Sequence, residues 1–228
     1  MKIRAIIFGS TGMVGKGLLF ECLESNNVES VLVINRHTCN ISHNKLKEII
    51  HENLFDLSGL TNELVGYNTC FFCLGVSSAG LSEKDYHKIT FELTISIAAL
   101  LLKINSDLKF CYISGAGTDS SEKGKIMWAR VKGKTENTLL AMPFKKVYMF
   151  RPGFIQPMKG IRSRTKLYNA LYLIFKPFYF ILKHFESVVT NSETLGKAMI
   201  ITVVKDYGKN ILESKDINEI VKTSPYSI

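Results

Sequence analysis

Hydrophobic positions along the chain follow two different periods. Short, almost continuous apolar runs, typical of strands buried on both faces, alternate with longer stretches of helical periodicity. The apolar runs predict strands at residues 3–8, 31–34, 46–50, 70–74, 108–113 and 147–150, with a last short strand beginning at 211. Helices are expected from the turn after the first strand to about residue 24, and over about 82–105, 125–141 and 193–205.

This alternation predicts an α/β fold with a Rossmann-like, doubly wound parallel sheet and a small C-terminal cap. We expect residues 1–158 to form the main domain. Residues 159–192 are expected to form the cap, a substrate or interaction segment, because aromatic and basic residues replace the regular alternation there. Residues 193–228 are expected to return to the main domain with a helix and a strand.

Composition narrows the class of protein. Of the 228 residues 46% are hydrophobic, which is enough for the core of one domain. Five prolines and the lack of low-complexity runs argue against disorder, and five irregularly spaced cysteines favour reduced thiols over a disulfide framework. Residues 1–4 lead directly into the first strand without a secretory signal. A cytoplasmic location is therefore expected, with peripheral attachment to a membrane surface as the alternative.

One pair of cysteines has the spacing of a redox or zinc motif. Cys70 and Cys73 lie in an apolar strand, where residues three apart point to opposite faces. The chain has no second Cys or His pair with ligand spacing. No metal site is expected.

The formal net charge of +9 is concentrated in one stretch. Residues 123–183 contain 14 basic residues and a single acidic residue, Glu136. Such a stretch attracts an anionic ligand, an anionic membrane surface or nucleic acid. Nucleic acid is least favoured, because the chain has no recognised nucleic-acid-binding module. We expect the basic, aromatic residues 159–185 to form a substrate lid or a homodimer surface, with a membrane surface as second choice.

A glycine-rich turn follows the first strand and directly precedes the first helix. Its three glycines suit a pyrophosphate: one permits the tight turn, one lets the backbone approach the phosphates, and one lets helix and strand pack closely. The helix N-terminus then offers N–H donors and a positive dipole. The residues expected to contact a dinucleotide here are Gly9, Ser10, Thr11, Gly12, Met13, Val14 and Gly15.

The end of the second strand bears on the choice of dinucleotide. NAD sites place a carboxylate there to bind the ribose hydroxyls, whereas NADP sites supply an arginine for the 2′-phosphate. Asn35 and Arg36 occupy this position, so NADP(H) is favoured over NAD(H). Asp56 and Leu57, after the third strand, are expected either to contact the adenine or to cap the next short helix.

Further motifs follow the glycine loop in a fixed order along the chain. They are Leu74 and Gly75 after the fourth strand, Ser114 at the end of the fifth, Lys132 in the next helix, and Pro152 and Gly153 after the sixth strand. Together they resemble the atypical short-chain dehydrogenases/reductases, in the branch similar to NAD-dependent epimerases/dehydratases. The set is most similar to the Tat-interactive-protein oxidoreductase group and its bacterial relatives. The resemblance covers most of residues 1–158.

The resemblance implies bound NADP(H) and a catalytic set of serine, tyrosine and lysine. In that chemistry the tyrosine exchanges a proton with the substrate oxygen while hydride moves to or from the nicotinamide. The lysine lowers the pKa of the tyrosine and binds the nicotinamide ribose, and the serine steadies the substrate oxygen. Ser114 and Lys132 match the serine and the lysine. The residues after the fourth and sixth strands are implied to contact the cofactor.

The tyrosine does not match. Trp128 stands four residues before Lys132, on the same helical face. An indole N–H only donates and does not ionise usefully near neutral pH, so Trp128 cannot transfer the proton. We expect it either to stack on the substrate or nicotinamide or to fill the pocket that the tyrosine would leave. Tyr172 and Tyr179 each precede a lysine by four residues but follow the sixth strand, the wrong order relative to Ser114.

Two classes of function therefore stay open. The first is an NADP(H)-dependent oxidoreductase or epimerase-like enzyme acting on a small carbonyl or alcohol substrate that the sequence does not identify. The second is a non-catalytic NADP(H) sensor or scaffold protein, associated with a membrane surface through residues 159–185. Whether the chain is an enzyme depends on the consequence of Trp128.

Overall fold

The computed structural model of the chain describes residues 2–161 and 187–224. The main sheet contains β1 (Ile3–Phe8), β2 (Val28–Asn35), β3 (Leu46–Ile50), β4 (Thr69–Phe72), β5 (Lys109–Ile113), β6 (Lys146–Arg151) and β9 (Ile211–Glu213). A separate two-stranded sheet contains β7 (Phe154–Gln156) and β8 (Val189–Asn191). The helices are α1 (Met13–Glu24), α2 (Thr61–Leu64), α3 (Glu83–His87), α4 (Leu93–Ile104), α5 (Met127–Ala141), α8 (Ser192–Lys205) and α9 (Ser214–Lys222).

The main sheet is parallel throughout. Its seven strands lie in the order β3-β2-β1-β4-β5-β6-β9, and each neighbouring pair has parallel register. The chain runs outward from β1 through β2 to β3 and then crosses to β4, on the other side of β1. Such a reversal of strand order is the place where doubly wound folds bind ligands, at the carboxyl ends of the strands. The predicted Rossmann-like sheet is confirmed.

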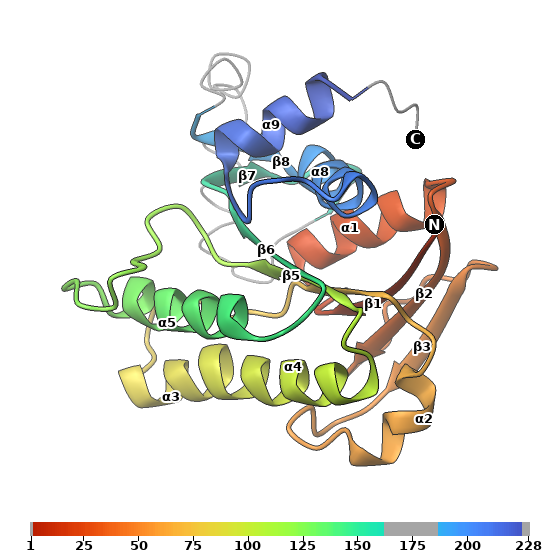
Figure 1. Ribbon diagram of the computed structural model, residues 1–228, viewed down its shortest axis with the longest axis horizontal. Helices are drawn as coiled ribbons and strands as arrows, with labels where there is room; N and C mark the ends of the chain where they lie inside the picture. The colour runs from red at the N-terminus through yellow and green to blue at the C-terminus, as the bar shows by residue number, and fades with distance from the viewer. Residues whose placement is uncertain (1, 162–186, 225–228) are drawn as a thin grey trace.

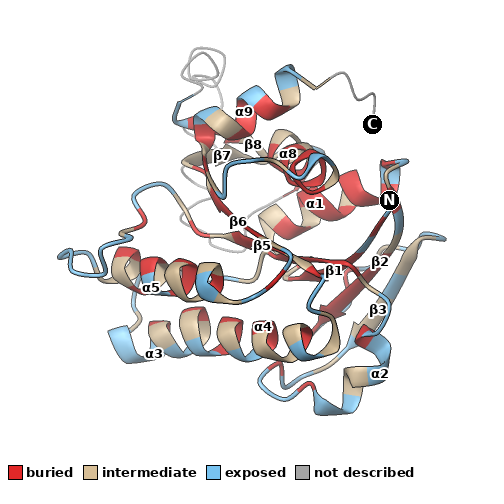
Figure 2. Cartoon of the chain, viewed as in Figure 1, coloured by how far each residue is buried: buried red, intermediate tan, exposed pale blue. Residues whose placement is uncertain are grey.

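Helices cover both faces of the sheet (Figure 1). Helices α1, α8 and α9 pack on one face, where Leu18, Leu195 and Ile217 are fully buried. Helices α3, α4 and α5 lie on the other, and Ile97 and Leu139 belong to the core beneath them. Figure 2 shows the inner strands of the sheet buried between the two helical layers, which is why they read as continuous apolar runs in the sequence, whereas the edge strand β3 is partly exposed.

Small residues bring α1 and α8 close together. A Cβ atom at Gly17 would lie 2.9 Å from the Cβ of Ser192, and one at Gly196 would lie 2.9 Å from the Cγ of Glu21. Neither glycine has room for a side chain. The helix predicted over 193–205 therefore packs directly against the helix that follows the glycine-rich loop.

The long predicted helix over 82–105 is confirmed with one irregularity. Ser82 caps its start, since the Ser82 hydroxyl accepts a hydrogen bond of 3.1 Å from the Asp85 N–H. A π-helical turn over Lys88–Glu92 separates α3 from α4. Strand β2 begins at residue 28 instead of 31, and β4 ends at residue 72 instead of 74. The strands β7 and β8 were not predicted, because three residues each carry little periodicity. Helix α9 was missed although Ile217, Ile220 and Val221 have helical spacing.

Helix α5 depends on a glycine that faces the preceding loop. A Cβ atom at Gly133 would lie 1.8 Å from the carbonyl oxygen of Asp119. Gly133→Ala is expected to destabilise the protein by about 2 kcal/mol from overpacking, although alanine is the better helix former. Gly59→Ala is the control, since nothing lies within 4 Å of a Cβ there. Urea unfolding followed by circular dichroism measures both, and equal stabilities for the two variants would contradict the prediction.

Candidate dinucleotide and catalytic site

The glycine-rich loop is packed between β4 and α1. Gly9 has a φ of +85°, and a Cβ there would lie 2.6 Å from the backbone nitrogen of Leu74. A Cβ at Gly15 would lie 2.2 Å from the carbonyl oxygen of Gly9. Only glycine fits these two positions, so the loop, the first turn of α1 and the end of β4 form one tightly packed unit.

The N-terminus of α1 opens beside this loop. Gly12 is the N-cap residue and supplies no side-chain cap, and the first turn contains no acidic residue. The Gly12 N–H donates to the Gly9 carbonyl at 2.9 Å. The positive end of the helix dipole therefore meets no carboxylate in its own first turn, and an anion would be stabilised there.

A cleft of about 390 Å³ lies at the carboxyl ends of β1, β2 and β4. Six of the residues predicted to contact a dinucleotide line this cleft, namely Gly9, Thr11, Gly12, Arg36, Leu74 and Gly75. Its remaining lining is Ile34, Asn35, His37, Glu52, Asn53, Leu54, Phe55, Cys73, Val76, Ile89 and Leu93. The loop that suits a pyrophosphate and the arginine that suits a 2′-phosphate thus face one cleft.

The other residues of the predicted loop do not line the cleft but lie next to it, in the core or in the first turn of α1. Ser10 is fully buried, and its hydroxyl donates to the Asn35 side-chain oxygen at 2.9 Å. Met13, Val14 and Gly15 lie in the first turn of α1, and Val14 packs against the core beneath that helix.

Asp56 and Leu57 are not among the residues that line this cleft. The cleft is lined instead by residues 52–55, which come immediately after β3. The Asp56 carboxylate accepts from the Ser58 N–H at 3.0 Å and from the Ser58 hydroxyl at 2.7 Å, and these bonds lower its pKa. Leu57 is buried in the core. The Asp56 side chain thus closes a turn just before the next helical segment, whose N-cap residue is Leu57 and which has no side-chain cap.

The predicted catalytic residues gather around the loop that follows β5. Lys132 Nζ donates to the Ser114 carbonyl oxygen, and the Ser114 hydroxyl donates to the Phe150 carbonyl at 3.2 Å. Trp128 lies over the same loop, with its Cη2 atom 3.7 Å from where a Cβ at Gly117 would be. Ser114, Trp128 and Lys132 thus form one cluster at the end of β5, the strand next to β4.

Burial changes the acidity of the lysine. It lowers the pKa of Lys132 to about 8, although the negative charge of Glu136, one turn further along α5, acts in the opposite direction. The amine can therefore gain or lose a proton close to neutral pH. Tyr112 is the tyrosine nearest to Ser114 in the sequence, but burial raises its pKa strongly and its ring is enclosed in the core.

Pro152 and Gly153 close the site from the β6 side. The Ala116 N–H donates to the Pro152 carbonyl at 2.9 Å, which ties the loop after β5 to the end of β6. The Gly153 N–H donates to the Ser214 hydroxyl at 2.7 Å, and a Cβ at Gly153 would lie 2.3 Å from the Val188 carbonyl oxygen. Both residues fix backbone geometry next to Ser114.

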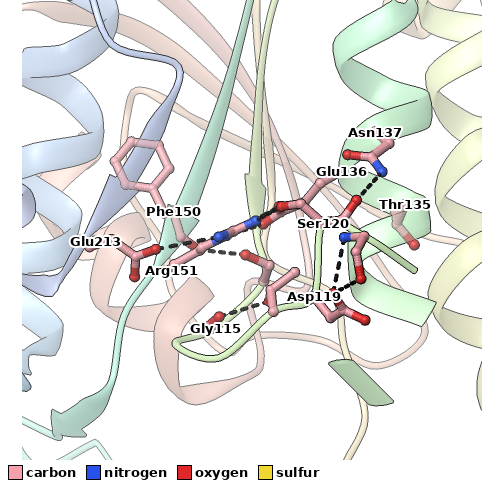
Figure 3. Close-up of polar contacts among 12 residues, drawn as sticks. Gly115, Asp119, Ser120, Thr135, Glu136, Asn137, Phe150, Arg151 and Glu213 are labelled. Carbon is pink, nitrogen blue, oxygen red and sulfur yellow. Dashed lines mark hydrogen bonds and ion pairs between the residues drawn. The ribbon is translucent and has the colours of Figure 1, made fainter. Parts of the chain in front are cut away.

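A buried ion pair supports this corner of the sheet (Figure 3). Glu136 is fully buried, and its carboxylate accepts from Arg151 Nε at 3.0 Å and from Arg151 Nη2. The same guanidinium reaches the Ser120 hydroxyl and lies 3.4 Å from Glu213 on β9. Arg151 thus joins the loop after β5, helix α5 and the last strand of the sheet.

Part of the basic stretch is neutralised within the molecule. Arg130 Nη2 lies 2.8 Å from Glu83, and Lys159 Nζ lies 2.9 Å from both Glu21 and Glu24. These partners come from segments far away in sequence, so a charge count along the chain overstates the charge available to a ligand. Most of the predicted cap, residues 162–186, lies outside the described residues.

The described part of the chain contains neither a cluster of metal ligands nor a helix that could span a membrane. No three His, Cys, Asp or Glu side chains gather there into a group that could hold a metal ion. Among the same residues, every helix is too short or too polar to cross a membrane.

No family model matches the chain, but individual relatives do. Protein FMP52, mitochondrial, of Debaryomyces hansenii is 26% identical over 165 residues, covering 70% of this chain and 71% of that protein. Protein HTATIP2 of Rattus norvegicus is 24% identical over 151 residues, covering 65% of this chain and 61% of that protein.

Solved structures agree with these relatives on the fold. The short-chain dehydrogenase/reductase YIR035C of Saccharomyces cerevisiae has a TM-score of 0.68 at 12% identity, covering 98% of this chain and all of that one. The chain therefore shares its fold with this protein. ADP-L-glycero-D-manno-heptose-6-epimerase of Helicobacter pylori matches with a TM-score of 0.66 at 17% identity, over 97% of this chain and 81% of that chain. The enzyme WbmH of Bordetella bronchiseptica, solved with NAD+, matches at 0.65 and 13% identity, over 93% and 75%.

The resemblance drawn from the motifs is thereby confirmed, and the predicted location is not. The prediction of a cytoplasmic protein, with a membrane surface as alternative, is contradicted by the relatives, because the FMP52 proteins of Debaryomyces hansenii and Saccharomyces cerevisiae are both named mitochondrial.

Several residues that line the cleft were not predicted from the sequence, among them residues 52–55 and Ile89. Residues 52–55 had a usable signal, since the residues directly after a parallel strand lie at the ligand-binding edge. Ile89 comes from the π-helical turn between α3 and α4, and such turns often occur at functional sites. Its position depends on how that helix packs, and the apolar pattern of residues 82–105 did not reveal it.

The Arg151–Glu136 pair generates a stability prediction. Glu136→Gln leaves a largely buried guanidinium without its main counter-charge, so we expect a loss of about 3 kcal/mol. Glu83→Gln breaks an ion pair whose carboxylate is 55% exposed and should cost less than about 1 kcal/mol. Urea unfolding at pH 7 measures both free energies. A loss for Glu136→Gln no larger than that for Glu83→Gln would show that the buried pair has little structural importance.

Proposed function

We propose that the chain binds NADP(H) in preference to NAD(H) and acts as an oxidoreductase or epimerase-like enzyme on a small carbonyl or alcohol substrate. The observation that carries this proposal is the cleft shared by the glycine-rich loop, Arg36 and the residues after β4. The neighbouring cluster of Ser114 and Lys132 supports a reacting centre beside it.

The lining of the cleft fits an adenine dinucleotide. Gly9 and Gly12 leave backbone in reach of a pyrophosphate, next to the N-terminus of α1. Leu54 and Phe55 offer apolar surface for an adenine. Arg36 supplies a cation for a 2′-phosphate, and residue 35 is an asparagine where an NAD site has a carboxylate.

The residues of this chain have separate roles in the proposed reaction. A bound nicotinamide supplies hydride chemistry. Lys132 would hold the nicotinamide ribose and contribute positive charge near the reacting oxygen, and its pKa of about 8 lets it hold or release a proton at neutral pH. The Ser114 hydroxyl, now on the Phe150 carbonyl, would rotate to steady the substrate oxygen.

A specific observation favours a second candidate, a non-catalytic NADP(H) sensor or scaffold. Trp128 occupies the helical position from which a tyrosine would reach the substrate oxygen, and it packs beside Gly117. An indole cannot exchange the proton. Trp128 does not line the cleft, so the contacts proposed there for the adenosine and the pyrophosphate do not require a tyrosine at this position.

The selectivity for the dinucleotide is directly testable. Titration calorimetry of the full chain should show tighter binding of NADPH than of NADH. Arg36→Ala should weaken NADPH binding by about tenfold to a hundredfold, the loss expected for charged hydrogen bonds, and leave NADH binding nearly unchanged. Lys47→Ala, which removes a cation paired with Glu63 away from the cleft, is the control. Failure of the wild-type chain to bind either dinucleotide would disprove the proposed function.

The two candidates predict different behaviour of one variant. If Trp128 has removed the proton-transfer group, Trp128→Tyr should raise NADPH-dependent turnover of a panel of small carbonyl substrates by about 10²-fold. Trp128→Phe serves as the matched control, because it changes the ring without adding a hydroxyl. A wild-type chain that turns over as fast as Trp128→Tyr would show that another group transfers the proton. No turnover by any of the three would favour the sensor.

A further inference from the structure

One carboxylate fastens the turn that follows β2. Glu48 lies on β3, next to the end of β2. Its Oε1 atom accepts from Asn35 Nδ2 at 2.7 Å and from the Cys39 N–H at 2.9 Å. Its Oε2 atom accepts from the Thr38 hydroxyl at 2.7 Å. Three donors from one short segment therefore converge on a single side chain.

These hydrogen bonds also determine the charge of the side chain. Burial alone would raise the pKa of Glu48, but the bonds from Thr38, Cys39 and Asn35 outweigh it and lower the pKa. Glu48 is therefore a carboxylate at neutral pH. Because its oxygens already accept from protein donors, it is poorly placed to bind ribose hydroxyls as an acid at the end of β2 would.

The network continues into the glycine-rich loop. The Ser10 hydroxyl donates to Asn35 Oδ1 at 2.9 Å, so both ends of the Asn35 amide are engaged, one by Ser10 and the other by Glu48. Ser10 is fully buried and Asn35 is 3% exposed. The amide has one fixed orientation, and it connects the proposed pyrophosphate loop to the strand end that faces the adenosine part of the cleft.

Arg36 and His37 lie between the anchored residues. Asn35 precedes them and Thr38 and Cys39 follow, and all three anchors bind the same carboxylate. Both Arg36 and His37 line the cleft and are exposed to solvent. The two residues thus form a short arch whose two ends are fixed while its side chains stay free to meet a ligand.

We propose that Glu48 is a positioning residue for dinucleotide selectivity: it holds the arch so that Arg36 and His37 meet the 2′-phosphate of NADP(H). The inference rests on the proposed function and assigns the selectivity to a residue that does not line the cleft. The physical reason is preorganisation. An arch that is already ordered loses less conformational entropy when its side chains bind a phosphate. Binding would be weaker if the backbone of the arch were no longer held in place.

The test compares two ligands that differ by the 2′-phosphate. Calorimetry with NADPH and with NADH is carried out on the full wild-type chain, on Glu48→Ala and on Glu63→Ala. Glu63 is the matched control, because its carboxylate pairs with a residue of β3, Lys47, and does not line the cleft. We expect Glu48→Ala to weaken NADPH binding by about tenfold or more, equivalent to about 1.4 kcal/mol, and NADH binding by less than about threefold. Glu63→Ala should match the wild type.

Each outcome decides a different point. If the wild type prefers NADPH and a folded Glu48→Ala keeps the same ratio of dissociation constants, the inference is wrong and the proposed function stands. If the wild type binds neither dinucleotide, the proposed function itself fails. Should Glu48→Ala lose its circular dichroism signal, Thr38→Val replaces it, because it removes one of the three donors and keeps the carboxylate. An unchanged ratio in Thr38→Val would then overturn the inference, and a reduced ratio would support it.

Discussion

The packing of the glycine-rich loop against its neighbours is the constraint on which the rest of the site depends. Gly9 lies so close to Leu74, and Gly15 so close to the Gly9 carbonyl, that β1, α1 and the end of β4 cannot shift independently. Because the strand order reverses between β1 and β4, this rigid unit lies at the carboxyl ends of the strands, at the point where doubly wound folds bind ligands. The cleft, the arch after β2 and the loop after β5 are all positioned relative to it.

Charge is arranged by the fold in a way that the chain order conceals. The stretch 123–183 accounts for the whole excess of positive charge, yet Arg151 and Lys159 find acidic partners on α5, β9 and α1. A guanidinium with three partners from different elements stabilises the junction of those elements and is unavailable to a ligand. Arg36, by contrast, comes from the first part of the chain, which has no excess of basic residues, and it lines the cleft. The density of charge along the sequence therefore does not show which charges are available to a ligand.

The sequence predicted the parts of the fold and site that depend on local pattern. Apolar runs located the strands of the main sheet, and three glycines between a strand and a helix located the loop, because both signals arise from residues adjacent in the chain. The place of Ile89 in the cleft and the hydrogen bonds that Glu48 accepts were not predictable in this way. Glu48 faces Asn35 only because β2 and β3 pair in one particular register, and Asp56 turned to Ser58 through contacts within its own turn.

The cleft and the cluster around Lys132 come from different elements of the fold. The cleft is built from β1, β2 and β4, whereas Trp128 and Lys132 lie on α5 beside β5, so replacing the tyrosine leaves the proposed dinucleotide contacts intact. Retaining a half-buried lysine has an energetic cost, since burial disfavours its charged form. A lysine that only assisted a tyrosine would bear that cost without a benefit once the tyrosine was absent. Under the proposed function Lys132, which donates to the Ser114 carbonyl, would keep one role without a tyrosine, that of holding the nicotinamide ribose.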